Sequence, residues 1–171
     1  MWGLNNTTKA LPKGTSSMSK HYTTLEWKRE SKDFSYQSYN RKHSWTFNSG
    51  VTIQASAASA FLGDPNFVNP EEAFVAALAS CHMLTFLAVA AKKRFIVDRY
   101  SDTAVGFLEK NVEGRMALNQ VTLKPVIIFG GKQKPSKVEL QNMHDVAHRQ
   151  CFIANSVKTK VTIDYSLNSI N

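Results

Sequence analysis

The stretch Asn69–Lys93, NPEEAFVAALASCHMLTFLAVAAKK, decides the fold. Its first residue, Asn69, can cap a helix, Pro70 suits the first helical position, and two glutamates follow where the helix dipole is positive. An uncharged run comes next, and lysines close the stretch at the end that favours positive charge. These features predict one long helix, whose length exceeds the usual globular mean and leaves room for a break or bend.

A helix that is apolar on nearly every face either spans a bilayer or lies at the centre of a globular core. The run is short for crossing ~30 Å of hydrocarbon, and Ser80, Cys81, His82 and Thr85 interrupt it in the middle. The flanking segments have the patterns of soluble strands. We therefore favour a central core helix with many small side chains, which other elements pack closely, and expect no membrane association.

The length and composition fit one globular domain. The chain has 171 residues, of which 43% are hydrophobic, enough for a substantial core. Residues 1–20 are polar and lack a secretory hydrophobic segment, so we interpret them as a disordered tail or vector remnant before a single domain over 21–171. Without such a segment, the two cysteines favour a cytoplasmic protein over a secreted one with a structural disulfide.

The net charge of +8 raises nucleic-acid binding as an alternative. The basic residues are scattered, however, and no nucleic-acid-binding motif accompanies them, so we favour a solvated basic surface. The sequence also contains neither a G-x-S-x-G motif nor a glycine-rich phosphate loop. These observations argue against nucleic-acid partners, against hydrolase chemistry and against a nucleotide cofactor.

Alternating segments on both sides of the helix predict strands. Before it, residues 21–30, 36–43, 45–47 and 51–55 form an expected meander of about three strands. After it, 95–100 is an expected short connection, 104–108 a strand and 117–129 a long strand, which must lie at an edge or bulge at Pro125.

A second helix is predicted from Ser136, because Glu139 three positions later completes a capping box. It is amphipathic and ends near Cys151, and residues 160–167 form a closing strand. The predicted order is β-β-β-α-β-β-α-β. This is an α+β architecture, with curved antiparallel sheets packed around the long central helix.

Cys81 has two interpretations, as a small buried hydrophobe or as a nucleophile. The second requires a positive partner that lowers its pKa and a second thiol, which Cys151 could supply, although their spacing does not show that they meet. His144, His148 and Cys151 share one helical face and could hold zinc, but no further cysteine lies nearby, and we expect no metal. His82 points about 100° around the helix from Cys81, so we interpret it as a core or interface histidine rather than a base.

Three segments together resemble a known family. NPEEAFVAALASCHMLTFLAVAAKK resembles the first-cysteine motif of the OsmC/Ohr family (osmotically inducible protein C / organic hydroperoxide resistance), and CFIANSVKTKV resembles its second-cysteine motif. YNRKHSWTFNSG resembles the arginine segment of the OsmC-like branch. In this order the segments span most of residues 36–163.

The resemblance implies a thiol peroxidase that reduces organic hydroperoxides to alcohols. Cys81 matches the peroxidatic cysteine, Cys151 the resolving cysteine and Glu71 the family's glutamate, while Arg41 is our choice for the arginine, with two basic neighbours. It also implies an OsmC-like fold and an intertwined homodimer with sites at the subunit boundary. No cofactor is needed beyond an external dithiol reductant, such as a lipoylated protein.

In these roles, Arg41 would stabilise the Cys81 thiolate and Glu71 would hold Arg41 by a charge-assisted pair. Ten residues of helix separate Glu71 from Cys81 by ~15 Å. They can share a site only if Arg41 bridges the gap, the helix breaks, or a partner subunit supplies one of them. Taken alone, Glu71 is better explained as charge compensation at the helix start, and only the match to the family motif favours a role in the site.

Phe152 and Ile153 are expected to line an apolar pocket, with His82 nearby, that would suit hydroperoxides with hydrophobic tails. The alternative hypothesis is a non-catalytic, stress-related protein of the same fold that binds a small hydrophobic ligand.

Overall fold

The computed structural model describes residues 19–166 and residue 168. The predicted tail, residues 1–20, lies almost entirely outside this range. The elements are β1 (Thr23–Glu26), β2 (His43–Phe47), β3 (Thr52–Ala55), α1 (Pro70–Lys92), β4 (Ile96–Asp102), β5 (Val105–Lys110), β6 (Met116–Leu123), β7 (Pro125–Gly130), α2 (Lys137–Gln150) and β8 (Lys160–Ile163). Short 3₁₀ turns, η1 (Ser59–Phe61) and η2 (Ala154–Ser156), precede α1 and follow α2. The predicted α+β class is confirmed.

Helix α1 begins as the sequence predicts. The Asn69 side chain accepts from the Glu72 N–H at 2.9 Å, and the Glu72 carboxylate accepts from the Asn69 N–H at 3.2 Å. This reciprocal capping box satisfies two of the backbone donors that a helix start leaves free. The helix then runs without a break to Lys92. The break or bend that its unusual length made plausible is absent.

Only one stripe of α1 is buried within the chain. It comprises Leu78, His82, Phe86, Val89 and Ala90. The other positions are half-buried or exposed, and Leu84 is 61% exposed. By length and composition α1 could cross a membrane, and 28% of its most apolar segment is buried in the chain. A single chain therefore covers less of this helix than its all-round apolar sequence predicts.

Four strands connect the two helices, where the sequence predicted two. The predicted connection after α1 is β4, and the predicted long strand is two strands, β6 and β7, on either side of Lys124. Pro125 has no N–H with which to continue the strand ladder. The N–H of the preceding residue, Lys124, donates to the Asp102 carboxylate at 2.7 Å and not to a strand backbone. The chain therefore leaves the β5-β6-β8 sheet here and enters the β4-β7 sheet. Within the first of these sheets, β6 and β8 pair in parallel.

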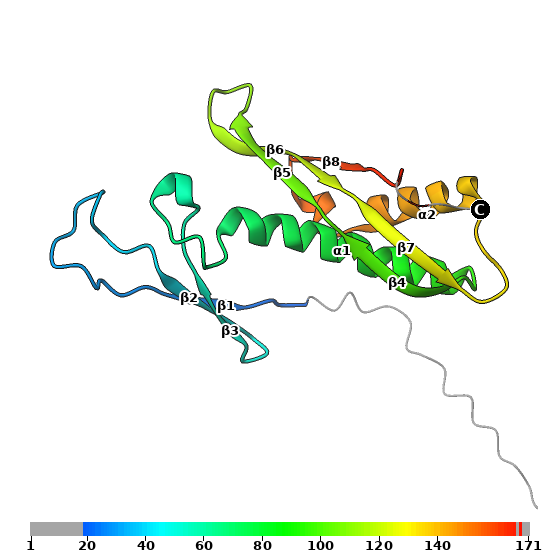
Figure 1. The fold of residues 1–171 in the computed structure, drawn as a ribbon, viewed down its shortest axis with the longest axis horizontal. Helices are drawn as coiled ribbons and strands as arrows, with labels where there is room; N and C mark the ends of the chain where they lie inside the picture. Colours follow the sequence, from blue (N-terminus) through cyan, green and yellow to red (C-terminus); the bar gives the residue numbers. More distant parts are fainter. Residues whose placement is uncertain (1–18, 167, 169–171) are drawn as a thin grey trace, which may run out of the picture.

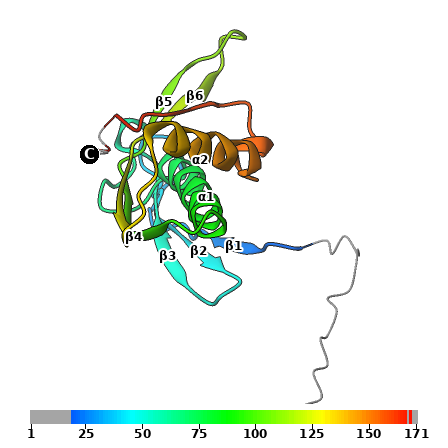
Figure 2. The ribbon, with the colours of Figure 1, turned by 90° about the vertical axis from the view of Figure 1, so that its right-hand side faces the viewer.

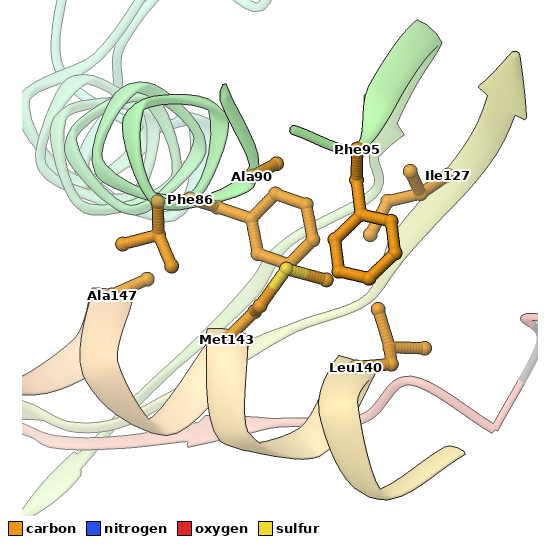
Figure 3. Close-up of a cluster of buried hydrophobic side chains, with 8 residues drawn as sticks. Phe86, Ala90, Phe95, Ile127, Leu140, Met143 and Ala147 are labelled. Atoms are coloured by element: carbon orange, nitrogen blue, oxygen red, sulfur yellow. The ribbon is translucent and has the colours of Figure 1, made fainter. Parts of the chain in front are cut away.

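The main core lies between α1, α2 and the β4-β7 pair. Figure 3 shows Phe86, Phe95, Leu140 and Met143 pointing toward one another from these elements. Each large side chain buried in this way contributes about 1.5–3 kcal/mol relative to an exposed one. A second cluster, around Leu78, Val121 and Leu123, joins α1 to the β5-β6-β8 sheet. Figure 2 shows α1 and α2 lying side by side, which fixes the relative position of their side chains.

The N-terminal sheet, β1-β2-β3, is antiparallel. Figure 1 shows that this sheet and the long loop between β1 and β2 extend away from the two helices. The loop contains a turn in which the N–H groups of Ser38 and Tyr39 donate to the Ser35 carbonyl, so the strand predicted over 36–43 is absent up to β2. Several aromatic side chains on it are exposed, among them Phe34 and Tyr36.

Candidate active site

The two cysteines meet between the helices. Cys81 lies in the middle of α1 and is half-buried, while Cys151 follows the last residue of α2 and is 1% exposed. The two side chains lie close enough for Cys81 to raise the pKa of the Cys151 thiol, although the residues are 70 positions apart in the chain. Both are free thiols. The structure therefore brings together the pair whose contact the spacing alone could not establish.

The geometry at the end of α2 positions Cys151. Its N–H donates to the His148 carbonyl at 3.3 Å, and its backbone is then extended, so the chain turns away into η2. The Ala154 N–H donates to the Cys151 Sγ at 3.4 Å. Burial, and next the hydrogen bond with Cys81, raise the pKa of the Cys151 thiol to about 11. Cys151 is therefore protonated at neutral pH and is the less accessible of the two thiols.

Two buried histidines lie beside this pair. His82 of α1 and His144 of α2 are joined by a hydrogen bond between Nε2 and Nδ1 at 3.1 Å. Burial, with a smaller effect of His148, lowers the pKa of His82 to about 4, and burial with His82 lowers that of His144 to about 3. Both rings are therefore neutral at neutral pH. His82 lies in the core, one of the two positions that the sequence predicted for it, and it does not line the cleft along α1 where a substrate contact could be made.

The zinc interpretation placed His144, His148 and Cys151 on one helical face. Among residues 19–166 and 168, no three His, Cys, Asp or Glu side chains are grouped so that they could hold a metal ion. The inward side of this helical face contacts α1 instead, through His144 and Cys151.

Arg41 lies just before β2, and its side chain makes no hydrogen bond to either cysteine among the described residues. Its guanidinium donates to the carbonyls of Tyr36, Tyr39 and Phe61, the last at 3.1 Å. It also stacks on the Tyr39 ring, 3.9 Å from the ring centroid. Within the described part of the chain, no hydrogen bond or ion pair joins Arg41 to Glu71 or to a cysteine. The predicted pairing of Arg41 with Glu71 is thus not made inside this chain.

Glu71 lines a cleft of about 650 Å³ along α1. Because α1 is continuous, ten residues separate Glu71 from Cys81 by ~15 Å. The cleft wall is mostly apolar, with side chains such as Val75, Met83 and Leu118. One carboxylate oxygen of Glu71 is buried without a hydrogen-bond partner among the described residues.

The same cleft contains two residues that the sequence analysis did not single out. Tyr100 and Asp102 of β4 each have a buried side-chain oxygen without a described partner. Burial raises the pKa of both side chains; the Lys124 hydrogen bond opposes this at Asp102, while Asp102 adds to it at Tyr100. Tyr100 and Asp102 occupy alternate positions of one strand, and this spacing could have indicated a shared face, but the residue pattern predicts only a short connection over 95–100.

Phe152 and Ile153, which the sequence predicted to contact substrate, lie in different surroundings. Phe152 is 81% exposed, and Ile153 packs against the cluster around Leu78. Neither side chain lines the cleft along α1.

The fold and the site together define an α+β protein in which two free thiols meet between two packed helices. Residues 63–166, more than half of the chain, match the family model described as OsmC-like protein. The chain belongs to this family, which confirms the resemblance seen in the cysteine motifs.

Solved structures share this fold. An OsmC-like protein of unknown function from Vibrio cholerae is 47% identical, with a TM-score of 0.83, over 86% of this chain and 99% of that one. An organic hydroperoxide resistance protein from Elizabethkingia anophelis is 17% identical, with a TM-score of 0.67, over 91% and 100%. The organic hydroperoxide resistance protein OhrB of Bacillus subtilis is 19% identical, with a TM-score of 0.59, over 85% and 98%. No curated protein matches the chain.

Proposed function

We propose that this protein is a thiol peroxidase that reduces organic hydroperoxides to alcohols. The observation that carries the proposal is the proximity of a half-buried thiol, Cys81, to a buried thiol, Cys151. Family membership supports it, since two relatives of the same fold are named organic hydroperoxide resistance proteins. A cytoplasmic location would supply the reducing environment that keeps both cysteines as thiols.

In the first step the Cys81 thiolate attacks the distal oxygen of the hydroperoxide. The O–O bond breaks, the alcohol leaves after taking up a proton, and Cys81 becomes a sulfenic acid. The partial exposure of Cys81 admits the oxidant to this sulfur rather than to Cys151.

In the second step the sulfur of Cys151 displaces the hydroxide from the Cys81 sulfenic acid. The thiol loses its proton, a disulfide forms between Cys81 and Cys151, and water leaves. The proximity of the two side chains supports this step. An external dithiol, such as a lipoylated protein, then reduces the disulfide and restores both thiols.

We further propose that a homodimer completes the site. Arg41 and Glu71 are not paired within one chain, and the Glu71 carboxylate has a buried oxygen without a described partner. A second copy packed on the exposed side of α1 could bring an arginine to this carboxylate and to the Cys81 thiolate. A permanently charged guanidinium there would stabilise the thiolate and the leaving alkoxide.

The test is consumption of an organic hydroperoxide by the purified protein with a dithiol present. Cys81→Ser is expected to abolish turnover, because the nucleophilic sulfur is gone. Cys151→Ser is expected to form the Cys81 sulfenic acid and stop there, which trapping with dimedone and intact mass would detect. Retained turnover in Cys81→Ser would overturn the proposal.

The cleft along α1 favours a second candidate function, non-catalytic binding of a small hydrophobic ligand. Its volume of about 650 Å³ and its apolar lining suit such a molecule. This alternative predicts that peroxide treatment leaves both thiols free, as measured by thiol counting and mass. Formation of the Cys81–Cys151 disulfide at a rate matching turnover would exclude it.

A further inference from the structure

The end of the molecule opposite the N-terminal sheet carries a charged surface that the proposed reaction does not use. Figure 1 shows that the end of α1 and the loop between β7 and α2 lie there. Residues 92–98 and 130–139, which form this end, contain six lysines and arginines but only two acidic residues. The six basic side chains are all exposed, and we call them the basic end: Lys92, Lys93, Arg94, Lys132, Lys134 and Lys137.

The fold brings the two halves of the basic end together. Ile96, at the start of β4, pairs with Gly130 at the end of β7, so the chain before β4 meets the chain after β7. Two hydrogen bonds from Ser136 chiefly lower the pKa of Glu139 in α2, desolvation opposes them, and Lys93 lies close enough to add to the lowering. The basic residues at the end of α1 and those leading into α2 are therefore neighbours.

Helix stability explains only part of this charge. Lys92 and Lys93 lie at the C-terminal end of α1, where the helix dipole favours cations. Lys137 is the first residue of α2, where the dipole disfavours them. Within the described part of the chain, the one ion pair joins Arg115 to Glu113 and involves none of the six. The protein thus leaves the repulsion among these charges uncompensated, a state that an anionic partner would relieve.

Exposed aliphatic side chains lie among the charges. Ile96 of β4 and Ile128 of β7 share the outer face of the β4-β7 pair, and each is more than half exposed. Val138, in the first turn of α2, is 68% exposed. The aromatic side chains of the same segments, Phe95 and Phe129, pack in the core instead. This surface therefore presents basic and aliphatic groups without an exposed aromatic ring.

That composition distinguishes among anionic partners. Protein interfaces are enriched in aromatic residues and arginine and are depleted in lysine. Proteins that bind single-stranded nucleic acid stack the bases on aromatic side chains. The basic end has five lysines to one arginine. Lysines around protruding aliphatic groups suit a membrane surface, where the ammonium groups meet anionic headgroups and the apolar side chains enter the interfacial layer.

We propose that the basic end binds the surface of membranes that contain anionic lipids. The lysines lie at the headgroups, Ile96 and Val138 reach into the interfacial layer, and α1 stays in the core of the protein. This binding is peripheral and differs from the membrane span considered for α1. It does not depend on the proposed function.

Together with the proposed function, on which this consequence alone rests, membrane binding points to a source of substrate. The unsaturated chains of membrane lipids form organic hydroperoxides. Cys81 lies eleven residues before Lys92 on the continuous helix α1, which is ~16 Å along its axis. A protein held by its basic end would keep its reactive sulfur close to the membrane surface.

The test is co-sedimentation of the purified full chain with vesicles at a fixed salt concentration. Vesicles of an equal mixture of phosphatidylglycerol and phosphatidylcholine are compared with vesicles of phosphatidylcholine alone, and the wild type is expected to bind only the mixture strongly. One cation near an anionic surface contributes about fivefold in binding, so Lys132→Gln with Lys137→Gln should weaken it roughly twenty-five-fold. Lys28→Gln with Lys32→Gln removes the same charge near the N-terminal sheet and should weaken binding far less.

A second pair of variants tests the aliphatic contribution. Val138→Ser should weaken binding to the mixed vesicles several-fold, because a polar side chain gains nothing from the interfacial layer. Val112→Ser, on the fully exposed β5-β6 turn, is the matched control and should not change it.

Three outcomes would overturn the inference. The first is equal binding to both kinds of vesicle. The second is an equal loss in the two lysine variants, which would reduce the effect to net charge. The third is displacement from the mixed vesicles by a short DNA duplex at equal phosphate concentration, which would favour a nucleic acid as the partner.

Turnover separates this binding from the proposed function. The variant at Lys132 and Lys137 should reduce dissolved hydroperoxides at the wild-type rate, and hydroperoxides carried in mixed vesicles more slowly. A wild-type protein that binds the mixed vesicles but reduces neither substrate contradicts the proposed function and leaves membrane binding standing. A wild-type protein that reduces dissolved hydroperoxides without binding the vesicles contradicts membrane binding alone.

Discussion

At the scale of single residues, Cys81 and Cys151 carry the same functional group in different surroundings. Cys81 is half-exposed on α1, whereas Cys151 is enclosed at the end of α2 and its pKa is raised to about 11. At neutral pH the second thiol therefore keeps its proton, and it becomes a nucleophile only when that proton is removed. This difference assigns the order in which the two sulfurs would react.

The buried histidines predict how stability depends on pH. Burial holds the pKa of His82 at about 4 and that of His144 at about 3, below the ordinary value of 6.5. As the pH falls below 6.5, the unfolded chain binds protons that the folded chain does not, so stability is present above this pH and is lost toward pH 3 to 4. We expect a loss of roughly 1–3 kcal/mol per histidine by pH 4.5.

Denaturant unfolding at pH 7 and pH 4.5 measures this loss. His144→Phe removes one of the two titrations, so its free energy of unfolding should fall less between these pH values than that of the wild type. His21→Gln, at an exposed site, should follow the wild type. Equal losses for wild type and His144→Phe would contradict the prediction.

Two pairs of residues at the candidate site show which contacts cannot be predicted from the residue pattern. The contact of Cys81 with Cys151 was expected only from the family resemblance, because it depends on how α1 packs on α2. The pairing of His82 with His144 was not predicted at all, for the same reason: a histidine in an apolar helix does not reveal its neighbour 62 positions away.

At the scale of elements, both helix starts were predictable because capping is local. Asn69 with Glu72, and Ser136 with Glu139, satisfy helix-start donors within three residues. The strands between the helices were harder, because Pro125 divides two strands that belong to different sheets. Strand partners are set by tertiary structure, and a run of alternating residues does not contain that information.

Removing the α1 cap should destabilise the protein. Asn69→Ala loses the side-chain acceptor for the Glu72 N–H, and we expect a cost of about 1 kcal/mol in the free energy of unfolding. Ser136→Ala is the matched change at α2, where the hydroxyl accepts from the Glu139 N–H at 3.2 Å, and should cost a similar amount. Chemical denaturation of both variants checks this, and an unchanged midpoint for Asn69→Ala would show that its cap contributes nothing.

At the scale of the whole molecule, the uncovered side of α1 predicts self-association. Leu84 is 61% exposed on a helix that is apolar on most faces. Because a second copy packed there would bury this side chain, Leu84→Glu should shift the protein from dimer to monomer in sedimentation velocity. Val112→Glu places the same charge on the fully exposed β5-β6 turn and should leave the assembly unchanged. A wild-type protein that sediments as a monomer would contradict the prediction.

The nearness of the two cysteines would also matter for chemical damage under the proposed function. A sulfenic acid that meets a second oxidant becomes a sulfinic acid, which cellular dithiols do not repair. If the protein is the thiol peroxidase proposed above, the nearness of Cys151 to Cys81 would favour capture by the neighbouring thiol over a second encounter with oxidant. Under a pulse of excess oxidant such a protein would accumulate as a repairable disulfide, so its working life would be limited by the supply of reductant and not by irreversible loss of its own sulfur.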